Sequence, residues 1–313
     1  MKPKIIVVPD VHGRSFWKDT EPYAGKVPII FLGDYLDPYY EYAVVSKMTQ
    51  ESVIQNFEEI IALKKAYPDM VTLLLGNHDC EYMYGLSVCN DRCDKANYER
   101  IRSLFRDNKD CFQLAAECRI AGKQYAFSHA GMHMRWLDSH VEGWTLENMV
   151  RRINEMNAEA LAVPDPEQTD FARALAKRDK HRSGKDAVGS PIWADAESFM
   201  TEYLLADIIQ VVGHTRTAYM QPGITSSEFF LDCGKIFLIS NGGKIYDKNG
   251  RRLTNKENPF NPPAEKGHES RHLDLDLFDR PFCRKCGSRD IYIKAGMCAD
   301  HWYCLDCGAD EIK

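Results

Sequence analysis

The sequence predicts an α/β fold, because short apolar segments alternate with a helical pattern and end in polar turns. Residues 5–8, 27–32 and 71–75 are short, mostly apolar runs, and apolar residues recur at three- and four-residue spacing over 46–66. Such runs are typical of buried strands, and that spacing is typical of an amphipathic helix. In open α/β sheets ligands bind at the carboxyl ends of the strands, so we expect a functional site at that edge.

The second half of the chain contains further strand patterns and one helix-prone region. Apolar runs at 125–127, 208–212 and 228–231 predict strands, and we expect 236–239 to form a hairpin with the last of them. The region from about 135 to 200 is charged, helix-prone and interrupted by prolines and glycines. We interpret it as a helical insertion or lid between two strands.

Length and local composition suggest how the chain is divided. The 313 residues are enough for one large domain and an appendage. Residues 258–272 are rich in proline, glycine and charge, a composition typical of linkers. We therefore predict a main domain over 1–257, a linker over 258–280 and a small C-terminal unit over 281–313.

The overall composition argues against several protein classes. Hydrophobic residues make up 44% and charged residues 27% of the chain, as in ordinary soluble globular proteins. A formal net charge of -6 excludes a globally basic surface for nucleic acid, although a local basic patch is compatible with it. No apolar run reaches the roughly 18 residues of a membrane span, and the first apolar run is too short for a signal peptide. We expect a cytoplasmic protein without membrane contact.

Five polar clusters, each following an apolar run, point to a metal site. They are Asp10-Val11-His12-Gly13, Gly33-Asp34-Tyr35-Leu36-Asp37, Gly76-Asn77-His78-Asp79, Ser128-His129-Ala130-Gly131 and Gly213-His214-Thr215. Carboxylate oxygens combined with imidazole nitrogens suit manganese, iron, zinc, nickel or cobalt better than calcium, which prefers oxygen alone. One such cluster is usually an ordinary loop, but five in this order indicate metal ligands.

With these motifs the sequence resembles the calcineurin-like metallophosphoesterases, especially the branch of phosphoprotein phosphatases and diadenosine-tetraphosphate hydrolases. The resemblance covers roughly residues 3–250 and includes the tryptophan-containing stretch 190–195. It implies a two-sheet β-sandwich flanked by helices (αββα), which strand alternation alone does not predict. It also implies two divalent cations in the domain 1–257. The implied ligands are Asp10, His12 and Asp34 for the first ion, and the bridging Asp34 with Asn77, His129 and His214 for the second.

The resemblance further implies hydrolysis of a phosphate ester by a metal-bridging hydroxide. Two adjacent cations lower the pKa of a shared water and offset charge on the phosphoryl oxygens. His78 matches the family's general acid, which protonates the leaving oxygen, and Asp37 matches the carboxylate that orients its imidazole. A purely structural role for His78 beside the ligands is the alternative.

The contact with the substrate phosphate departs from the family pattern. Phosphoprotein phosphatases and their bacterial relatives carry an arginine directly after the aspartate that matches Asp37, whereas here that position is Pro38. Proline has neither a charge nor an N–H group. Arg14, Arg182 and Arg216 are candidate replacements, and each is also explicable as an ordinary surface charge. The tyrosines of the same loop either stack on an aromatic leaving group or pack against the insertion.

The C-terminal unit has a zinc-binding pattern. Two Cys-x-x-Cys pairs each offer two thiolates from one tight turn, a strong indicator of one structural zinc. The four cysteines are Cys283, Cys286, Cys304 and Cys307. The unit resembles a zinc ribbon with strands at 291–293 and 301–303, and so short a unit hardly folds without metal. Zinc ribbons contact proteins or nucleic acids, or are structural, and the sequence does not choose among these roles.

Three functions are compatible with the motifs. The leading one is a serine/threonine-phosphatase-like phosphomonoesterase acting on a phosphoprotein, a nucleotide or a nucleic-acid end. The alternative enzyme is a dinucleoside polyphosphate hydrolase or a phosphodiesterase on nucleotides or nucleic acid, because the acid His78 serves all of these reactions. A non-catalytic scaffold would carry degenerate ligand positions, and here every ligand position is filled.

Overall fold

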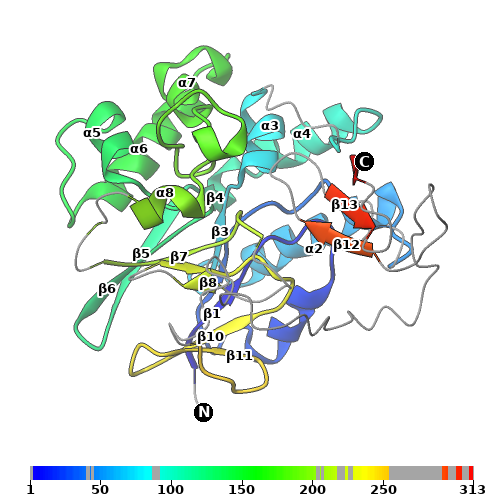
Figure 1. Ribbon diagram of the computed structural model, residues 1–313, viewed down its shortest axis with the longest axis vertical. Coiled ribbons are helices and arrows are strands. Elements are labelled where there is room, and N and C mark those ends of the chain that lie inside the picture. Colours follow the sequence, from blue (N-terminus) through cyan, green and yellow to red (C-terminus); the bar gives the residue numbers. More distant parts are fainter. Residues whose placement is uncertain are drawn as a thin grey trace.

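The computed structural model contains two mixed β-sheets flanked by helices, and this confirms the α/β architecture (Figure 1). A separate three-stranded sheet is formed near the C-terminus. The residues that the structure describes are 3–39, 43, 46–86, 92–201, 205, 208–216, 223–224, 228–253, 291–294, 301–304 and 310–312.

The first sheet has the strand order β11-β10-β1-β2-β3-β4. Its strands are β1 (Pro3–Val8), β2 (Ile29–Phe31), β3 (Val71–Leu74), β4 (Phe112–Gln113), β10 (Phe237–Ser240) and β11 (Ile245–Asp247). Strands β1 to β4 run parallel, β10 pairs antiparallel with β1, and β11 pairs antiparallel with β10. The turns that follow β1, β2 and β3 therefore meet at one edge of the sheet.

The second sheet has the order β5-β6-β7-β9-β8. Its strands are β5 (Ala115–Ile120), β6 (Lys123–Ser128), β7 (Ile208–Val212), β8 (Gly223–Ile224) and β9 (Glu228–Phe230). Strands β6, β7 and β9 are parallel, whereas β5 and β8 pair antiparallel with their neighbours. The turns after β6 and β7 therefore also share an edge.

The hairpin expected between 228–231 and 236–239 is wrong. Strand β9 lies beside β7 in the second sheet, whereas β10 pairs with β1 in the first, with Ile239 opposite Ile5. Phe237 of β10 is fully buried in the layer between the sheets. An inner position between β1 and β11 buries both faces of β10, which a local hairpin with β9 would not do.

Alternating side chains of β1 show how the layers form. Ile6 and Val8 belong to the apolar cluster that also holds Phe57 of the helix α2 (Gln50–Ala66). Ile5 and Val7 belong to a second cluster, which contains side chains of both sheets. Because successive residues of a strand point to opposite faces, one strand contributes to the helix-covered layer and to the layer between the sheets.

The helix α2 begins at Gln50, later than the 46–66 segment suggested. Thr49 caps it, because its hydroxyl accepts a hydrogen bond from Ser52 N (3.1 Å) and the Ser52 hydroxyl accepts one from Thr49 N (2.9 Å). These two bonds satisfy backbone N–H groups at the helix start.

Further helices lie between the strands of each sheet. They are α3 (Asn77–Tyr84), α4 (Tyr98–Asp107), α5 (Met134–His140), α6 (Met149–Leu161), α7 (Asp170–Leu175) and α8 (Ala196–Thr201), with short 3-10 turns η1 (Phe16–Tyr23), η2 (Lys109–Cys111), η3 (Pro166–Gln168) and η4 (Lys180–Arg182). The green helices α5, α6 and α7 lie together at the upper left of the view in Figure 1, above the second sheet. They belong to the region for which the sequence predicts a helical insertion.

The C-terminal sheet consists of β12 (Ile291–Lys294), β13 (His301–Cys304) and β14 (Asp310–Ile312), paired antiparallel. The linker 258–280 and the predicted zinc ligands Cys283, Cys286 and Cys307 lie outside the described residues. None of the helices in the described part of the chain combines the length and the apolar character that a bilayer crossing requires.

Candidate metal centre

The six predicted metal ligands converge where the carboxyl edges of the two sheets meet. Asp10 and His12 follow β1, Asp34 follows β2, Asn77 opens α3 after β3, His129 follows β6 and His214 follows β7. Each of the six residues is at most 6% exposed. The parallel strands of both sheets therefore deliver these side chains, although they are far apart in sequence, to one buried place.

Two candidate ligand groups share Asp34. One consists of Asp10, His12 and Asp34, and the other of Asp34, His129 and His214, with the ligand atoms of each group within 4.8 Å of one another. The Asp34 Oδ2 atom lies 3.6 Å from Nε2 of His12 and 3.5 Å from Nε2 of His129. This is the placement expected of a carboxylate between two cations.

Asn77 completes the second group. Its Oδ1 lies 3.0 Å from Nε2 of His129, and Nδ1 of His214 lies 3.0 Å from the same nitrogen. The amide oxygen and the two imidazoles thus face one point.

The histidine tautomers fit a bound metal. Nδ1 of His12 lies 2.9 Å from the Leu36 carbonyl, and Nδ1 of His129 lies 2.8 Å from the Leu32 carbonyl. A carbonyl only accepts, so each Nδ1 donates to it and Nε2 is the nitrogen that faces the centre. At His129 this nitrogen lies against the Asn77 oxygen. A nitrogen and an oxygen that converge in this way suit a cation between them.

Burial changes the pKa values of several site residues in directions that favour metal binding. Burial lowers the pKa values of His12 and His214 well below the usual range, so both rings are neutral, the form that binds metal. Burial also raises the pKa of Asp34 to about 7. A carboxylate that loses its hydration in this way is stabilised by a nearby cation.

Several site residues have left-handed backbone conformations. The φ angle is +45° at His12, +51° at Asp34, +57° at Asp37 and +60° at His214. Such angles are uncommon for residues other than glycine, and they concentrate at functional sites, where the surrounding structure must hold them. Here they turn the chain sharply after each strand, so that the side chains point into the centre.

Two glycines allow the backbone to approach the carboxylates. A Cβ at Gly76 would lie 2.1 Å from Asp34 Oδ1, and one at Gly213 would lie 2.0 Å from Asp10 Oδ1. The residue after Gly213 donates its backbone N–H to Asp10 (2.9 Å), and the N–H of His78 bonds Asp34 Oδ1 in the same way (3.0 Å). The glycines are needed because these contacts leave no room for a side chain.

His78, the predicted general acid, lies next to Asp37 and beside the candidate metal ligands. Nδ1 of His78 is 2.9 Å from Asp37 Oδ2, and the ring centroids of His78 and His12 are 5.2 Å apart. The Tyr82 hydroxyl donates to the other Asp37 oxygen at 2.6 Å. Sequence reasoning missed Tyr82, although its position four residues after His78 on α3 places both on one helix face.

The three predicted phosphate arginines have different surroundings. Arg14 donates to the carbonyls of Val11 and Asp10 in its own loop and lies 3.6 Å from Asp232, which follows β9. Arg182 forms an ion pair with the Asp195 carboxylate and donates to Thr215 Oγ1 at 2.7 Å.

The third, Arg216, has its guanidinium carbon 4.5 Å from the centroid of the Tyr39 ring. Of the three predicted arginines, Arg216 is the one that lies on this aromatic ring, and the ring is edge-on to the His12 imidazole with centroids 4.9 Å apart.

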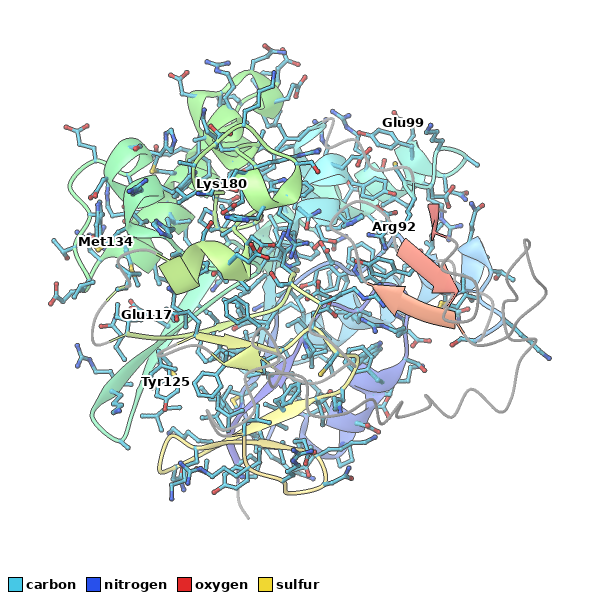
Figure 2. All side chains as sticks on the ribbon, viewed as in Figure 1. Arg92, Glu99, Glu117, Tyr125, Met134 and Lys180 are labelled. Carbon is cyan, nitrogen blue, oxygen red and sulfur yellow. The ribbon has the colours of Figure 1, made fainter. Side chains whose placement is uncertain are left out.

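Two further charged residues were missed. Arg92, labelled in Figure 2, belongs to the segment that connects α3 to α4 in the chain. Its Nη2 lies 2.7 Å from Nε2 of His78, and its Nη1 donates to the Asp37 carbonyl at 2.9 Å. No motif surrounds Arg92, so its role could not be predicted from the sequence. The Asp79 carboxylate accepts N–H groups of Asp34 and Gly76 (2.7 and 2.8 Å) and thereby joins two ligand loops. Its position in the first turn of α3 is a recognisable capping signal.

Comparison with known proteins identifies the family. A family model described as calcineurin-like phosphoesterase matches residues 3–217. Two crystal structures of a cold-active protein tyrosine phosphatase are similar, each with a TM-score of 0.53. A point mutant of it is 16% identical, with 81% of this chain and 80% of that chain covered. The other structure is 17% identical, with 84% and 81% covered. At these identities the likeness concerns the fold, whereas the family match extends over every candidate ligand: the chain belongs to the calcineurin-like phosphoesterases and is a metal-dependent phosphoric ester hydrolase.

Proposed function

We propose that this protein is a dinuclear phosphomonoesterase of the serine/threonine-phosphatase type. The observation that carries the proposed acid catalysis is the His78–Asp37 pair, joined at 2.9 Å and placed beside two ligand groups that share Asp34. This pair serves monoester and diester cleavage alike, and the substrate panel below separates the two. An imidazole with a carboxylate partner next to a metal centre is suited to protonating a leaving oxygen.

The ligands divide between two cations as the shared carboxylate suggests. We assign Asp10, His12 and Asp34 to the first ion, and Asp34, Asn77, His129 and His214 to the second. When bound, such ions acidify a water and offset charge on the phosphoryl oxygens. The mixture of imidazole, carboxylate and amide donors suits manganese, iron, zinc, nickel or cobalt.

The remaining residues handle the proton. His78 donates from Nε2 to the leaving oxygen, while Asp37 holds Nδ1–H and stabilises the charged ring. Tyr82 fixes the Asp37 carboxylate through its second oxygen. A guanidinium only donates hydrogen bonds, so Nε2 of His78 accepts from Arg92 as the structure stands. Proton donation therefore requires that Arg92 move off this nitrogen.

A metal-by-substrate panel tests the assignment. Protein loaded with manganese, nickel, zinc or magnesium is assayed with an aryl phosphate, a bis-aryl phosphate, a phosphopeptide and diadenosine tetraphosphate. We expect the monoesters to have the highest kcat/KM. Faster cleavage of diadenosine tetraphosphate or of the diester would favour the alternative enzyme, a dinucleoside polyphosphate hydrolase or phosphodiesterase.

The variant His78→Ala tests the acid. Loss of general-acid catalysis typically costs about 100- to 10,000-fold, and the cost is greatest for poor leaving groups. We expect kcat to decrease far more for alkyl phosphates such as phosphoserine than for aryl phosphates, because the leaving group of an aryl phosphate departs without protonation. Equal losses for both would remove His78 from the acid role.

For the C-terminal unit we propose one structural zinc bound by Cys283, Cys286, Cys304 and Cys307. The proposal is supported by the paired cysteine spacing and by the antiparallel strands β12, β13 and β14 between and after the pairs. Elemental analysis of the full chain should give one zinc that is lost from a Cys283→Ser, Cys286→Ser double variant. A contact with a protein or a nucleic acid and a purely structural role are both compatible with such a unit.

A further inference from the structure

Arg92 directly contacts the proton-transfer atom of the proposed mechanism. Its Nη2 lies 2.7 Å from Nε2 of His78, the nitrogen that would face the leaving oxygen. Its Nη1 bonds the carbonyl of Asp37 at 2.9 Å. The guanidinium therefore occupies the hydrogen-bonding position that the leaving oxygen would take in the proposed mechanism.

Two arginines, Arg92 and Arg216, lie over the ring of Tyr39 next to His78. The guanidinium carbon of Arg92 lies 3.7 Å from the ring centroid, and that of Arg216 lies 4.5 Å from it. Both distances fall within the range of cation–π attraction. The edge-to-face contact between Tyr39 and His12 fixes the ring against the metal centre. Aromatic stacking thus orients two guanidinium groups from segments far apart in the sequence.

Tyr39 lies directly after Pro38, the position at which the sequence departs from the family motif. It stands two residues after Asp37, and the family motif carries arginine at the position of Pro38. The loop cannot supply a cation at Pro38, but its next residue attracts two cations from elsewhere. A guanidinium fork matches two oxygens of a phosphoryl group, and two forks beside a dinuclear centre favour a dianion over a monoanion.

We propose that Arg92, oriented by Tyr39 and joined by Arg216, binds the phosphoryl group in place of the arginine absent at position 38, and that this pair selects phosphomonoester dianions over phosphodiester monoanions. The inference rests on the proposed function and names its substrate class. In this arrangement Arg92 leaves His78 Nε2 and donates to a phosphoryl oxygen. Arg92 and Arg216 contact the substrate, whereas Tyr39 is a positioning residue.

The first test is the binding of inorganic phosphate to metal-loaded protein, measured by calorimetry. Hydrogen bonds to charged groups contribute enough that Arg92→Ala should weaken phosphate binding by about tenfold to a hundredfold. Arg92→Lys should recover part of the affinity, because lysine keeps the charge but not the fork. The matched control is Arg100→Ala on α4, since Arg100 pairs with Glu51 and Glu58 at the surface. It should bind phosphate as the wild type does.

The second test compares an aryl phosphate with its bis-aryl diester. Arg92→Ala should lower the ratio of monoester to diester kcat/KM by at least about tenfold, as expected when one charge-assisted contact to a dianion is lost. Tyr39→Leu should raise KM for the monoester by a smaller factor than Arg92→Ala does, and should change KM more than kcat. Metal content and thermal melting of each variant establish that the centre and the fold are retained.

The outcomes separate this inference from the proposed function. If metal-loaded wild type cleaves neither ester, the proposed function is wrong. If wild type prefers the monoester but Arg92→Ala and Arg92→Lys keep both the phosphate affinity and the ester ratio, Arg92 is not a phosphate ligand. Equal losses on both esters with unchanged phosphate affinity would show that Arg92 only supports His78, and this too would overturn the inference.

Discussion

At the scale of single residues, the site depends on contacts that fix the orientation of charged groups. Asp37 illustrates this, because its two oxygens are divided between His78 Nδ1 and the Tyr82 hydroxyl. The carboxylate is 2% exposed, so solvent does not replace a lost partner. The direction of the His78 ring therefore depends on a tyrosine that does not reach the substrate.

We expect Tyr82→Phe to impair leaving-group protonation without removing metals. Loss of one buried hydrogen bond costs about 1 kcal/mol, which corresponds to roughly a fivefold to tenfold decrease in kcat for an alkyl phosphate. The effect on an aryl phosphate should be smaller, because its leaving group is less dependent on the acid. The measurement is kcat for both substrates at saturating metal. Tyr98→Phe is the control, since it keeps the ring that packs against Tyr82 and removes only a hydroxyl that donates to the Glu81 carbonyl and not to Asp37.

The sequence predicted some residues of the site much better than others, for a physical reason. Metal ligands need particular donor atoms at strand ends, so Asp10, His12 and Asp34 stand in short motifs that are visible in the sequence. Arg92 needs only a positive charge at the right distance, and its partners His78 and Tyr39 impose no local pattern around it. Its place follows from the packing of the segment between α3 and α4, which no spacing rule describes.

At the scale of elements, each candidate ligand lies in or just after a turn that follows a strand. The neighbouring backbone leaves little room for side chains in these turns. The turn after β7 shows this most clearly, because Gly213 brings the backbone so close that its missing Cβ would meet Asp10. The same turn donates the His214 N–H to both Asp10 oxygens, at 2.9 and 3.1 Å. The end of one sheet thereby fixes a ligand of the other.

We expect Gly213→Ala to weaken metal binding at least about tenfold, equivalent to a loss of about 1.4 kcal/mol. A methyl group 2.0 Å from Asp10 Oδ1 must push the carboxylate off the His214 N–H. The measurement is metal affinity by titration, with circular dichroism to follow the fold. Gly242→Ala is the matched control, because a Cβ there meets only Ser240 Oγ at 3.9 Å. Similar affinities for the two variants would contradict the steric argument.

Element boundaries and pairings were predictable only in part. Strands β1, β2 and β3 were visible because each is a buried apolar run followed by a polar turn. The pairing of β10 was not visible, because runs at 228–231 and 236–239 have the length and spacing of a hairpin. Their sheets differ because β10 finds its buried partner in β1, more than two hundred residues earlier in the chain. Local patterns carry no information about such a distant choice.

At the scale of the whole molecule, the candidate metal centre draws its residues from both sheets. The first sheet and its turns provide Asp10, His12, Asp34 and Asn77, and the second provides His129 and His214. Apolar side chains hold the layer between the sheets, but at the site edge that layer gives way to buried carboxylates and imidazoles. Without cations the sheets meet there through groups whose burial is unfavourable. Metal binding should therefore stabilise the fold and not merely enable the reaction.

We expect chelation to lower the thermal stability of the main domain. A ligand at one hundred times its Kd stabilises the native state by about 2.7 kcal/mol, and for a domain of this size each kcal/mol shifts Tm by about 2–4 °C. Removal of the cations should thus lower Tm by about 5–10 °C, measured by calorimetry before and after restoration of manganese. Asp34→Asn is the comparison, because it removes the carboxylate shared by both ligand groups and leaves the C-terminal cysteines intact. This variant should show little manganese-dependent change, and an increase equal to that of the wild type would place the stabilising ion elsewhere in the chain.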